Sequence, residues 1–327
     1  MKPKVSIIIV NYNGKELIRK LLKSLSKSAF RNYKIIMVDN ASTDGSQEFI
    51  RKNYKKAKLV ENRENLGYSG INSAIRHCTG KYILFLNNDM EIEKNCISNL
   101  VKTIESDKNA VMAAPTLVNF YNKGLKSNGT WASRSFYSGH IKGNGRKIAK
   151  EIPYLGVGLI RKDFVDSYGY LFDPDYFIYA EDLDLGLRIR LNGKKILFNP
   201  DAVLYHMHAV TSQKSGSAFT TFLMERNLMR TFFTSLSVKN IALLMPYVLL
   251  IRLIAILKDL ITLKFMCAFA RIKAVFWVII NFKLITKKRN IVLIEDCAQA
   301  FGTTFKDQLV GKFGDIAKKH RQNHSDG

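Results

Sequence analysis

Three short polar stretches contain the residue types that could carry out chemistry in this chain. They are residues 87–89 (NND) after an apolar run, residues 181–184 (EDLD) at the start of a helical pattern, and residues 205–208 (YHMH) after another apolar run. Carboxylates and imidazoles bind divalent cations and act as acids or bases. Each stretch alone is also typical of a turn, an acidic helix start or surface histidines. Taken together, the three stretches are candidates for one functional site.

Strands and helices alternate along the first part of the chain and determine where these polar groups lie. Continuous apolar runs at residues 4–10, 33–38, 57–60 and 81–86 predict buried strands, and helical spacing predicts helices at about 17–25, 42–53 and 69–78. The alternation predicts an α/β fold with a doubly wound, mainly parallel sheet. Further strands are expected at 154–160, 195–198 and 202–205, with helices at 161–168 and 181–191. Residues 121–150, rich in Gly, Ser and Lys, predict a long surface loop of the kind that often forms a lid.

Polar side chains come at the carboxyl ends of four predicted strands. These are Asn11, Asp39, Asn62 and Asp89, and that edge is where open α/β sheets bind ligands. Turns favour Asn and Asp in general, but four such residues on one edge predict a ligand-binding crevice. The chain contains neither GxGxxG nor GxxxxGK[ST], which argues against a dinucleotide-dependent oxidoreductase or a P-loop NTPase.

Several motifs in a fixed order resemble family 2 glycosyltransferases. They are VSIIIVNYNG, VDNASTDGS, ENLGYSGINSAI, YILFLNND and YFIYAEDLDLGLRIRLNGKKILFNPDAVLYH, within about residues 4–215. The branch that they resemble most is rhamnosyltransferase-like and builds bacterial surface polysaccharides. The resemblance implies the GT-A fold and an inverting transfer of a sugar from a nucleotide-diphosphate donor, dTDP-rhamnose or a UDP-sugar.

The resemblance also implies roles for the three polar stretches. Asp89 and His206 would hold a divalent metal, Mg²⁺ or Mn²⁺, which offsets the charge that builds on the departing diphosphate. Asn87 stands where the family has the first carboxylate of its Asp-x-Asp motif, and it could ligate the metal through its amide oxygen or bind the ribose. Of the pair Glu181 and Asp182, Asp182 is expected to be the general base, because adjacent carboxylates raise each other's proton affinity.

The nucleotide is expected at the first half of the sheet. By resemblance, Asp39 would accept a hydrogen bond from the pyrimidine or the ribose. Four asparagine side chains and one glycine would line or close the same crevice, with the glycine allowing close approach of the backbone. The expected nucleotide-binding residues besides Asp39 and Asn87 are Asn11, Asn13, Asn65, Gly67 and Asn72.

The segment after residue 220 is basic and apolar. The chain has a formal net charge of +24, and residues 226–289 hold 12 basic side chains against the single Asp259. Apolar runs at 241–251, 253–257 and 274–280 are each shorter than the about 20 residues of a membrane-spanning helix. They predict helices lying at an anionic membrane surface. A spanning helix at 241–257 and an ordinary helical packing unit are the alternatives.

The expected partners follow from the resemblance and the charge. The acceptor is expected to be a polyprenyl-linked glycan, which a peripheral enzyme at the cytoplasmic face of the membrane would meet at the bilayer. No nucleic-acid partner is expected, because no RNP, zinc-finger or helix-turn-helix motif is present. The short apolar run at the N-terminus does not resemble a signal peptide. Two other hypotheses stay open, a transferase that charges polyprenyl phosphate directly and a non-catalytic scaffold that binds nucleotide-sugars.

The last stretch of the chain has a different character. Residues 290–317 resemble a fragment of the sugar aminotransferases that use pyridoxal phosphate, with matches at Asp296, Gln299 and Gly302. The segment that carries their Schiff-base lysine is absent, so an inactive remnant is expected. The predicted domains are therefore 1–220 (glycosyltransferase), 221–289 (membrane-associating helices) and 290–327 (remnant and tail).

Overall fold

A computed structural model of the chain describes residues 2–142, 151–207, 217–287, 304–305 and 308–309. His208 and nearly all of the aminotransferase-like stretch lie outside the described residues, so the predictions made for them stay predictions. Within that stretch, two short strands, β11 (Thr304–Phe305) and β12 (Gln308–Leu309), pair antiparallel.

The centre of the molecule is one mixed sheet in which the strand order is β3-β2-β1-β4-β9-β6-β10-β5. Strands β1 to β4 are parallel to one another, as the sequence predicts, and β10 is parallel to β6. Strand β9 runs antiparallel between β4 and β6, and β5 runs antiparallel to β10. The sheet strands are β1 (Val5–Asn11), β2 (Tyr33–Asp39), β3 (Lys58–Glu61), β4 (Tyr82–Asn87), β5 (Met90–Ile92), β6 (Ala110–Asn119), β9 (Gly158–Arg161) and β10 (Lys195–His206).

Helices connect these strands and supply the other half of the core. Helix α1 (Lys15–Ser26) buries Ile18, Leu21, Leu22 and Leu25, the stripe that the helical spacing predicts. Helix α3 packs on β6, β9 and β10, and α5 packs on β10. The remaining helices of this part are α2 (Ser46–Asn53), α3 (Cys96–Glu105), α4 (Lys162–Tyr168) and α5 (Glu181–Leu191), with 3₁₀ turns η1 (Gly67–His77) and η2 (Pro174–Tyr176).

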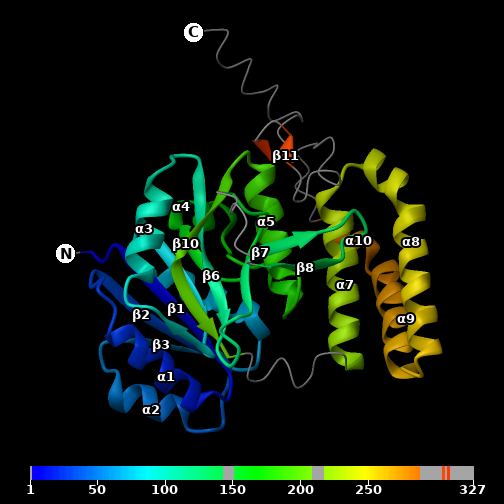
Figure 1. Cartoon of the computed structure of the whole chain (residues 1–327). Helices are drawn as coiled ribbons and strands as arrows, with labels where there is room; N and C mark the ends of the chain where they lie inside the picture. The colour runs from blue at the N-terminus through cyan, green and yellow to red at the C-terminus, as the bar shows by residue number, and fades with distance from the viewer. Residues whose placement is uncertain (1, 143–150, 208–216, 288–303, 306–307, 310–327) are drawn as a thin grey trace.

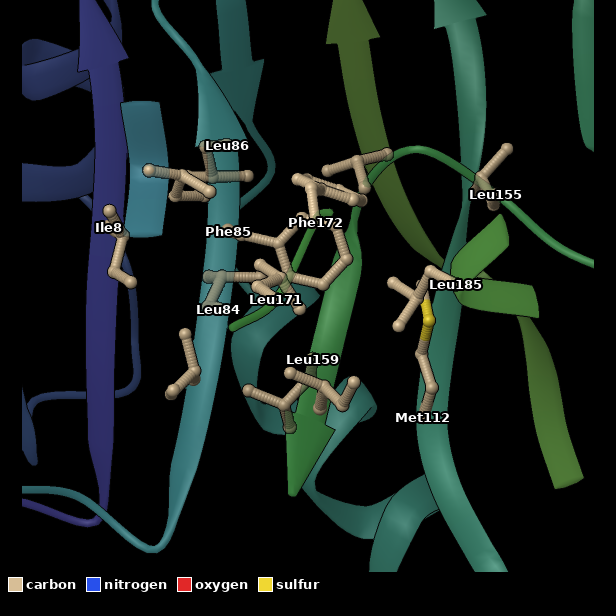
Figure 2. Packing of buried hydrophobic residues seen from close by; sticks show 14 of the residues in the cluster. Ile8, Leu84, Phe85, Leu86, Met112, Leu155, Leu159, Leu171, Phe172 and Leu185 are labelled. Carbon is tan, nitrogen blue, oxygen red and sulfur yellow. The ribbon is translucent and has the colours of Figure 1, made fainter. Parts of the chain in front are cut away.

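The core joins the two halves of the sheet. Figure 2 shows Ile8 of β1 beside the leucines of β4 and, further along, Leu159 of β9 and Met112 of β6. Phe85 meets Phe172 edge-on, with ring centroids 5.6 Å apart. Phe172 belongs to the chain that leads toward α5, so the same apolar packing that builds the sheet also fixes the approach to that helix.

Two parts of this region differ from the sequence-based expectation. The helix expected at 69–78 is the 3₁₀ helix η1 (Gly67–His77). Its residues Tyr68 and Asn72 are hydrogen-bonded to distant backbone, and two glycines weaken its α-helical preference. The surface loop expected at 121–150 is wrong for much of its length. There the chain forms a hairpin of β7 (Lys126–Ala132) and β8 (Ser138–Lys142), anchored because β7 pairs with β6.

A group of helices follows the sheet. They are α7 (Ala218–Ser235), α8 (Val238–Ile261), α9 (Phe265–Ile280) and α10 (Phe282–Lys287). In Figure 1 α7, α8 and α9 stand together at one side of the sheet, and α9 packs on both α7 and α8. The two apolar runs expected at 241–257 form one continuous helix, α8. Within the described part of the chain, α8 is the one helix that is long and apolar enough to cross a membrane. Length and composition alone are weak evidence that a helix does so.

Candidate functional site

Asp89 and His206 lie side by side, as the sequence predicts. Asp89 sits in the tight connection from β4 to β5, and β5 pairs with the end of β10 so that His206 is opposite Met90. The backbone N–H of Met207 donates to the carbonyl of Asp89 at 2.9 Å. His206 Nε2 is therefore 3.1 Å from Asp89 Oδ1, and Asp89 is only 6% exposed.

This pair fits a divalent cation in part. A carboxylate oxygen and an imidazole nitrogen are both accepted by Mn²⁺, and Mg²⁺ commonly takes only one or two protein carboxylates beside substrate phosphates and water. No group of three or more His, Cys, Asp or Glu that could enclose a cation is found among the described residues. Asp89 and His206 could hold a metal whose remaining ligands come from a diphosphate and water. Metal binding itself stays a prediction.

Glu181 and Asp182 begin α5, where Glu181 is buried and Asp182 is partly buried. Glu181 is 7% exposed and its Oε2 has no hydrogen-bond partner. Burial and then the charge of Asp182 raise the pKa of Glu181. Burial also raises the pKa of Asp182, while a hydrogen bond from the Leu183 N–H opposes the rise. Burial, rather than the neighbouring carboxylate, is therefore the main cause, which corrects the reason given from the sequence.

The next carboxylate on this helix has a structural partner. Asp184 Oδ2 accepts from Arg188 Nε at 2.8 Å, and both side chains are buried. Arg188 also donates to the carbonyl of Leu171 at 2.6 Å. Asp184 thus ties α5 to the chain that precedes it, whereas Asp182 keeps part of its surface accessible to solvent.

Tyr68 is buried against the chain that leads into α5, where its N–H donates to the carbonyl of Phe177. Burial raises the pKa of Tyr68 well above its usual value, and the charges of Glu181, Asp182 and Asp89 raise it further. Its hydroxyl donates to the carbonyl of Gly156 at 3.0 Å, and a Cβ on Gly156 would be 3.4 Å from Asp182 Oδ2. The charges of all three carboxylates therefore act on the same tyrosine. The sequence analysis did not single out Tyr68, although the signal was present in the ENLGYSG motif.

Hydrogen bonds among side chains join the polar residues at the carboxyl edge of β1 and β2. Asp39 has no exposed surface, and its carboxylate accepts from Asn11 Nδ2 at 2.9 Å, from the Ser42 N–H at 2.8 Å and from Gln47 Nε2 at 2.8 Å. Asn11 also accepts from Asn88 Nδ2 at 2.8 Å, which links β1 to the end of β4. The buried Asp39 thus binds the residues around it at this edge. Its expected contact with a nucleotide stays a prediction.

Two other expected nucleotide-binding residues lie at the same edge. Asn13 has a positive φ of 50°, and its Oδ1 accepts from the Thr43 N–H at 2.8 Å. Asn87 is the last residue of β4 and pairs with Val10 of β1 in the register of the sheet. Asn13 and Asn87 therefore lie at the edge where the crevice is expected, and their contact with a nucleotide stays a prediction.

The remaining expected nucleotide-binding residues bind the protein's own chain. A Cβ on Gly67 would lie 2.2 Å from the carbonyl oxygen of Phe177, so the absence of a side chain at Gly67 allows the backbone of Phe177 to approach; the expected nucleotide contact stays a prediction. Asn72 donates to the Phe172 carbonyl at 2.6 Å and accepts from the Leu171 N–H at 2.9 Å. Asn65 Oδ1 accepts from the Gly67 N–H at 2.9 Å. These residues fasten η1 to the chain that leads into α5.

The close approach at Gly67 predicts a stability effect. Gly67→Ala should destabilise the fold more than Gly169→Ala, measured as the free energy of unfolding in urea. Both glycines have positive φ, 63° and 76°, which costs alanine about 1–2 kcal/mol. Only Gly67 has backbone within 4 Å of the added methyl group, since nothing lies that close at Gly169. Equal losses in the two variants would contradict the close packing of η1 on Phe177.

Comparison with known proteins now decides the family. The model of "Glycosyl transferase family 2" matches residues 6–169. The chain belongs to glycosyltransferase family 2. The matched residues of this glycosyltransferase include Asp89, whereas Asp182 and His206 come after them. A second model, the "DegT/DnrJ/EryC1/StrS aminotransferase family", matches residues 279–318.

Curated relatives are glycosyltransferases as well. The rhamnosyltransferase WbbL of Escherichia coli K12 is 30% identical over 229 residues, which are 62% of this chain and 84% of that protein. The poly(ribitol-phosphate) beta-glucosyltransferase of Bacillus spizizenii is 26% identical over 211 residues, and the match spans 62% of this chain but 32% of that protein. The chain is therefore a glycosyltransferase similar to a rhamnosyltransferase.

Solved structures agree on the fold. Staphylococcus aureus TarS 1–349 in complex with UDP-GlcNAc has a TM-score of 0.53 at 20% identity, covering 71% of this chain and 67% of that chain. The mannosyltransferase PcManGT of Pyrobaculum calidifontis in complex with GDP-Man and Mn²⁺ has a TM-score of 0.52 at 18% identity, covering 88% and 84%. The expected GT-A fold is thus confirmed.

Proposed function

We propose that the protein is an inverting, metal-dependent glycosyltransferase that moves a sugar from a nucleotide-diphosphate donor to a growing, lipid-linked surface polysaccharide. One observation carries the proposal. The pair of Asp89 and His206 and the partly buried carboxylate of Asp182 come from distant parts of the chain, and the charges of Asp89 and Asp182 both act on the buried Tyr68.

The reaction assigns a role to each group. Asp182 would take the proton of the acceptor hydroxyl as its oxygen bonds to the anomeric carbon, while the bond from that carbon to the diphosphate oxygen breaks. A single displacement of this kind inverts the anomeric configuration. A divalent cation at Asp89 and His206 would offset the negative charge on the diphosphate. The raised pKa of Asp182 suits a base, because a carboxylate of ordinary pKa takes up a proton poorly.

The donor is proposed from the relatives. One relative is named as a rhamnosyltransferase, and TarS was crystallised with UDP and with UDP-GlcNAc. These support dTDP-rhamnose or a UDP-sugar as the donor. The test is thermal unfolding with each nucleotide-sugar, with MnCl₂ or with EDTA. The donor should raise the melting temperature only with Mn²⁺, because binding to the folded state alone stabilises it. Stabilisation that is the same in EDTA would contradict metal-dependent binding.

We further propose that α8 and α9 attach the enzyme to the cytoplasmic face of the membrane, where a polyprenyl-linked acceptor lies. The outward faces of these helices are apolar, and exposed lysines accompany them at 258, 264 and 273. Contiguous exposed apolar surface of this kind is rare on proteins that do not bind partners or lipid. Exposed apolar side chains on the two helices include Leu249, Leu250, Leu253, Ile254, Leu257, Phe265, Met266, Phe269, Phe276, Ile279 and Ile280.

The inward face of α8 is polar, which favours a helix lying on the bilayer over one that spans it. Arg252, 2% exposed, donates to the Ser135 carbonyl at 2.9 Å and lies 3.6 Å from Glu225. Arg271 of α9 pairs with both Glu225 and Asp259. These buried charges bind α8 and α9 to α7 and to the β7–β8 hairpin. If α8 spanned the membrane, Arg252 and Asp259 would have to separate from these partners, and unpaired charges are costly in a bilayer.

Vesicle binding tests this attachment. The protein should co-sediment with vesicles containing anionic phosphatidylglycerol and should be largely released by 1 M NaCl, since salt screens surface charges. The double variant Leu250→Glu/Phe269→Glu should lose most of this binding. The matched control is Tyr121→Glu, which changes an exposed aromatic residue outside α8 and α9. This variant should bind the vesicles as wild type does. Retention after both salt and alkali would contradict peripheral attachment and favour a span.

A further inference from the structure

The backbone of residues 177–180, directly before Glu181 and Asp182, adopts strained conformations. Phe177 has φ 63° and ψ −70°, and the Ile178 N–H donates to the Tyr176 carbonyl at 2.8 Å, which is a γ-turn of the rare type. Tyr179 and Ala180 follow with φ values of 72° and 62°. L-residues avoid these conformations unless surrounding structure holds them, and such strain clusters at functional sites.

Asn227 of α7 holds this turn from one side. It has no exposed surface, and its Nδ2 lies 3.0 Å from the carbonyl oxygen of Tyr176, 2.9 Å from that of Ile178 and 2.7 Å from that of Tyr179. Its Oδ1 accepts from Arg226 Nε at 2.9 Å. The amide is therefore satisfied at both ends, and three carbonyls of the turn converge on one side chain.

The remaining carbonyl of the turn is bound from the other side. The carbonyl of Phe177 accepts from the Tyr68 N–H at 2.7 Å, and the hydroxyl of Tyr68 donates to the carbonyl of Gly156, which lies beside Asp182. On the α7 side, Thr231 bonds the hydroxyl of Tyr176 at 2.7 Å and Arg230 pairs with Asp175 at 2.5 Å. The turn is thus fixed between η1 and α7, directly before the first turn of α5.

We propose that Asn227 is a positioning residue for Asp182, acting by holding residues 176–179 in the strained turn that sets the start of α5. The inference rests on the proposed role of Asp182 as the base. Helix α7 thereby belongs to the catalytic machinery, although its residues lie beyond the family match and mostly within the helical segment that the sequence analysis separated at 220.

The direct test is Asn227→Ala, assayed by release of nucleoside diphosphate from dTDP-rhamnose, UDP-glucose or UDP-GlcNAc, whichever wild type uses fastest. The kcat should fall by about 10²-fold, as expected when a reacting group is misplaced by about 1 Å. The KM for the donor should change less than threefold, because the side chain of Asn227 bonds the turn and Arg226 rather than the candidate metal ligands. The matched control is Thr234→Ala on the same helix, whose hydroxyl bonds only carbonyls of α7, and its kcat should equal that of wild type.

A second variant separates positioning from general stability. Adding Ala180→Gly to Asn227→Ala should recover at least fivefold in kcat, because glycine adopts positive φ without the penalty that Asn227 offsets. If Asn227 only stabilised the fold, Asn227→Ala and the double variant would both lose UDP–Mn²⁺ binding, and Ala180→Gly would not restore kcat. Either result would overturn the proposal. So would a folded Asn227→Ala enzyme with wild-type kcat.

Asp182→Asn distinguishes this inference from the function on which it rests. If Asp182→Asn keeps full activity, the proposed function fails and the positioning role fails with it. If Asp182→Asn is inactive while Asn227→Ala is fully active, only the positioning role is wrong.

Discussion

Asp182→Asn should lower kcat by about 10³-fold while the protein still binds its nucleotide-sugar. General-base catalysis contributes typically about 10²–10⁴-fold, and the amide cannot take the acceptor proton. Binding should survive because Asp89, His206 and the crevice of β1 and β2 are unchanged. Initial rates and donor-dependent thermal stabilisation measure the two effects separately. The matched control is Asp201→Asn, an exposed carboxylate on β10, which should leave kcat unchanged.

The same assignment predicts a pH dependence. The base works only when it is deprotonated, and burial raises the pKa of Asp182 to about 6. The rate of the wild-type enzyme should therefore be low below pH 6 and should rise as the pH increases through about 6. The sign for stability is the opposite. A raised pKa means that the folded state binds the proton more tightly, so Asp182 opposes folding increasingly as pH rises through 6. Asp182→Asn should consequently be at least as stable as wild type at pH 7.5, and a less stable variant would contradict the burial of this charge.

Asp89→Ala should abolish the metal dependence of donor binding and reduce activity by at least about 10²-fold. One of the two candidate ligands is removed, and His206 loses the carboxylate 3.1 Å from its Nε2. Stabilisation of charge on a leaving group by a bound cation is worth several kcal/mol. The readout is the difference in UDP-induced melting temperature between MnCl₂ and EDTA, which should be clear for wild type and absent for the variant.

The matched control for this second prediction is Glu93→Ala. Glu93 follows β5 four residues after Asp89, and its side chain is exposed. Its removal should leave the Mn²⁺-dependent shift intact. A wild-type-like shift in Asp89→Ala, or full activity of the wild-type enzyme in EDTA, would show that the pair of Asp89 and His206 does not hold the metal.

The sequence predicted the sheet well where burial alone decides structure. Residues 5–11 of β1 are all buried, so their continuous β-branched run reports a strand with two covered faces. The apolar stripe of α1 and the helix at α5 were equally predictable. In these elements, local pattern and tertiary environment demand the same residues.

Prediction failed where structure depends on a distant partner. The β7–β8 hairpin exists because β6 supplies the next strand, and β9 is inserted antiparallel between β4 and β6. Neither pairing is visible in a local window. Gly67 gave a correct signal of close backbone approach, but its partner is Phe177, 110 residues later.

The candidate site was predictable in its residue types and only partly in its environment. Asp89 and His206 meet as expected from the motifs. The desolvation of Glu181 and the burial of Tyr68 follow from packing of η1 against the chain before α5. That packing joins segments about 110 residues apart in the sequence, so the spacing of residues along the chain does not predict it.

The most direct measurement is a crystal structure of the protein with Mn²⁺ and UDP, with the metal located by its anomalous scattering. We expect one strong peak bonded to both Asp89 and His206 and to the diphosphate, with the Asp182 carboxylate facing the space where the sugar would lie. A peak bonded to neither residue, or an Asp182 side chain directed away from the nucleotide, would contradict the account.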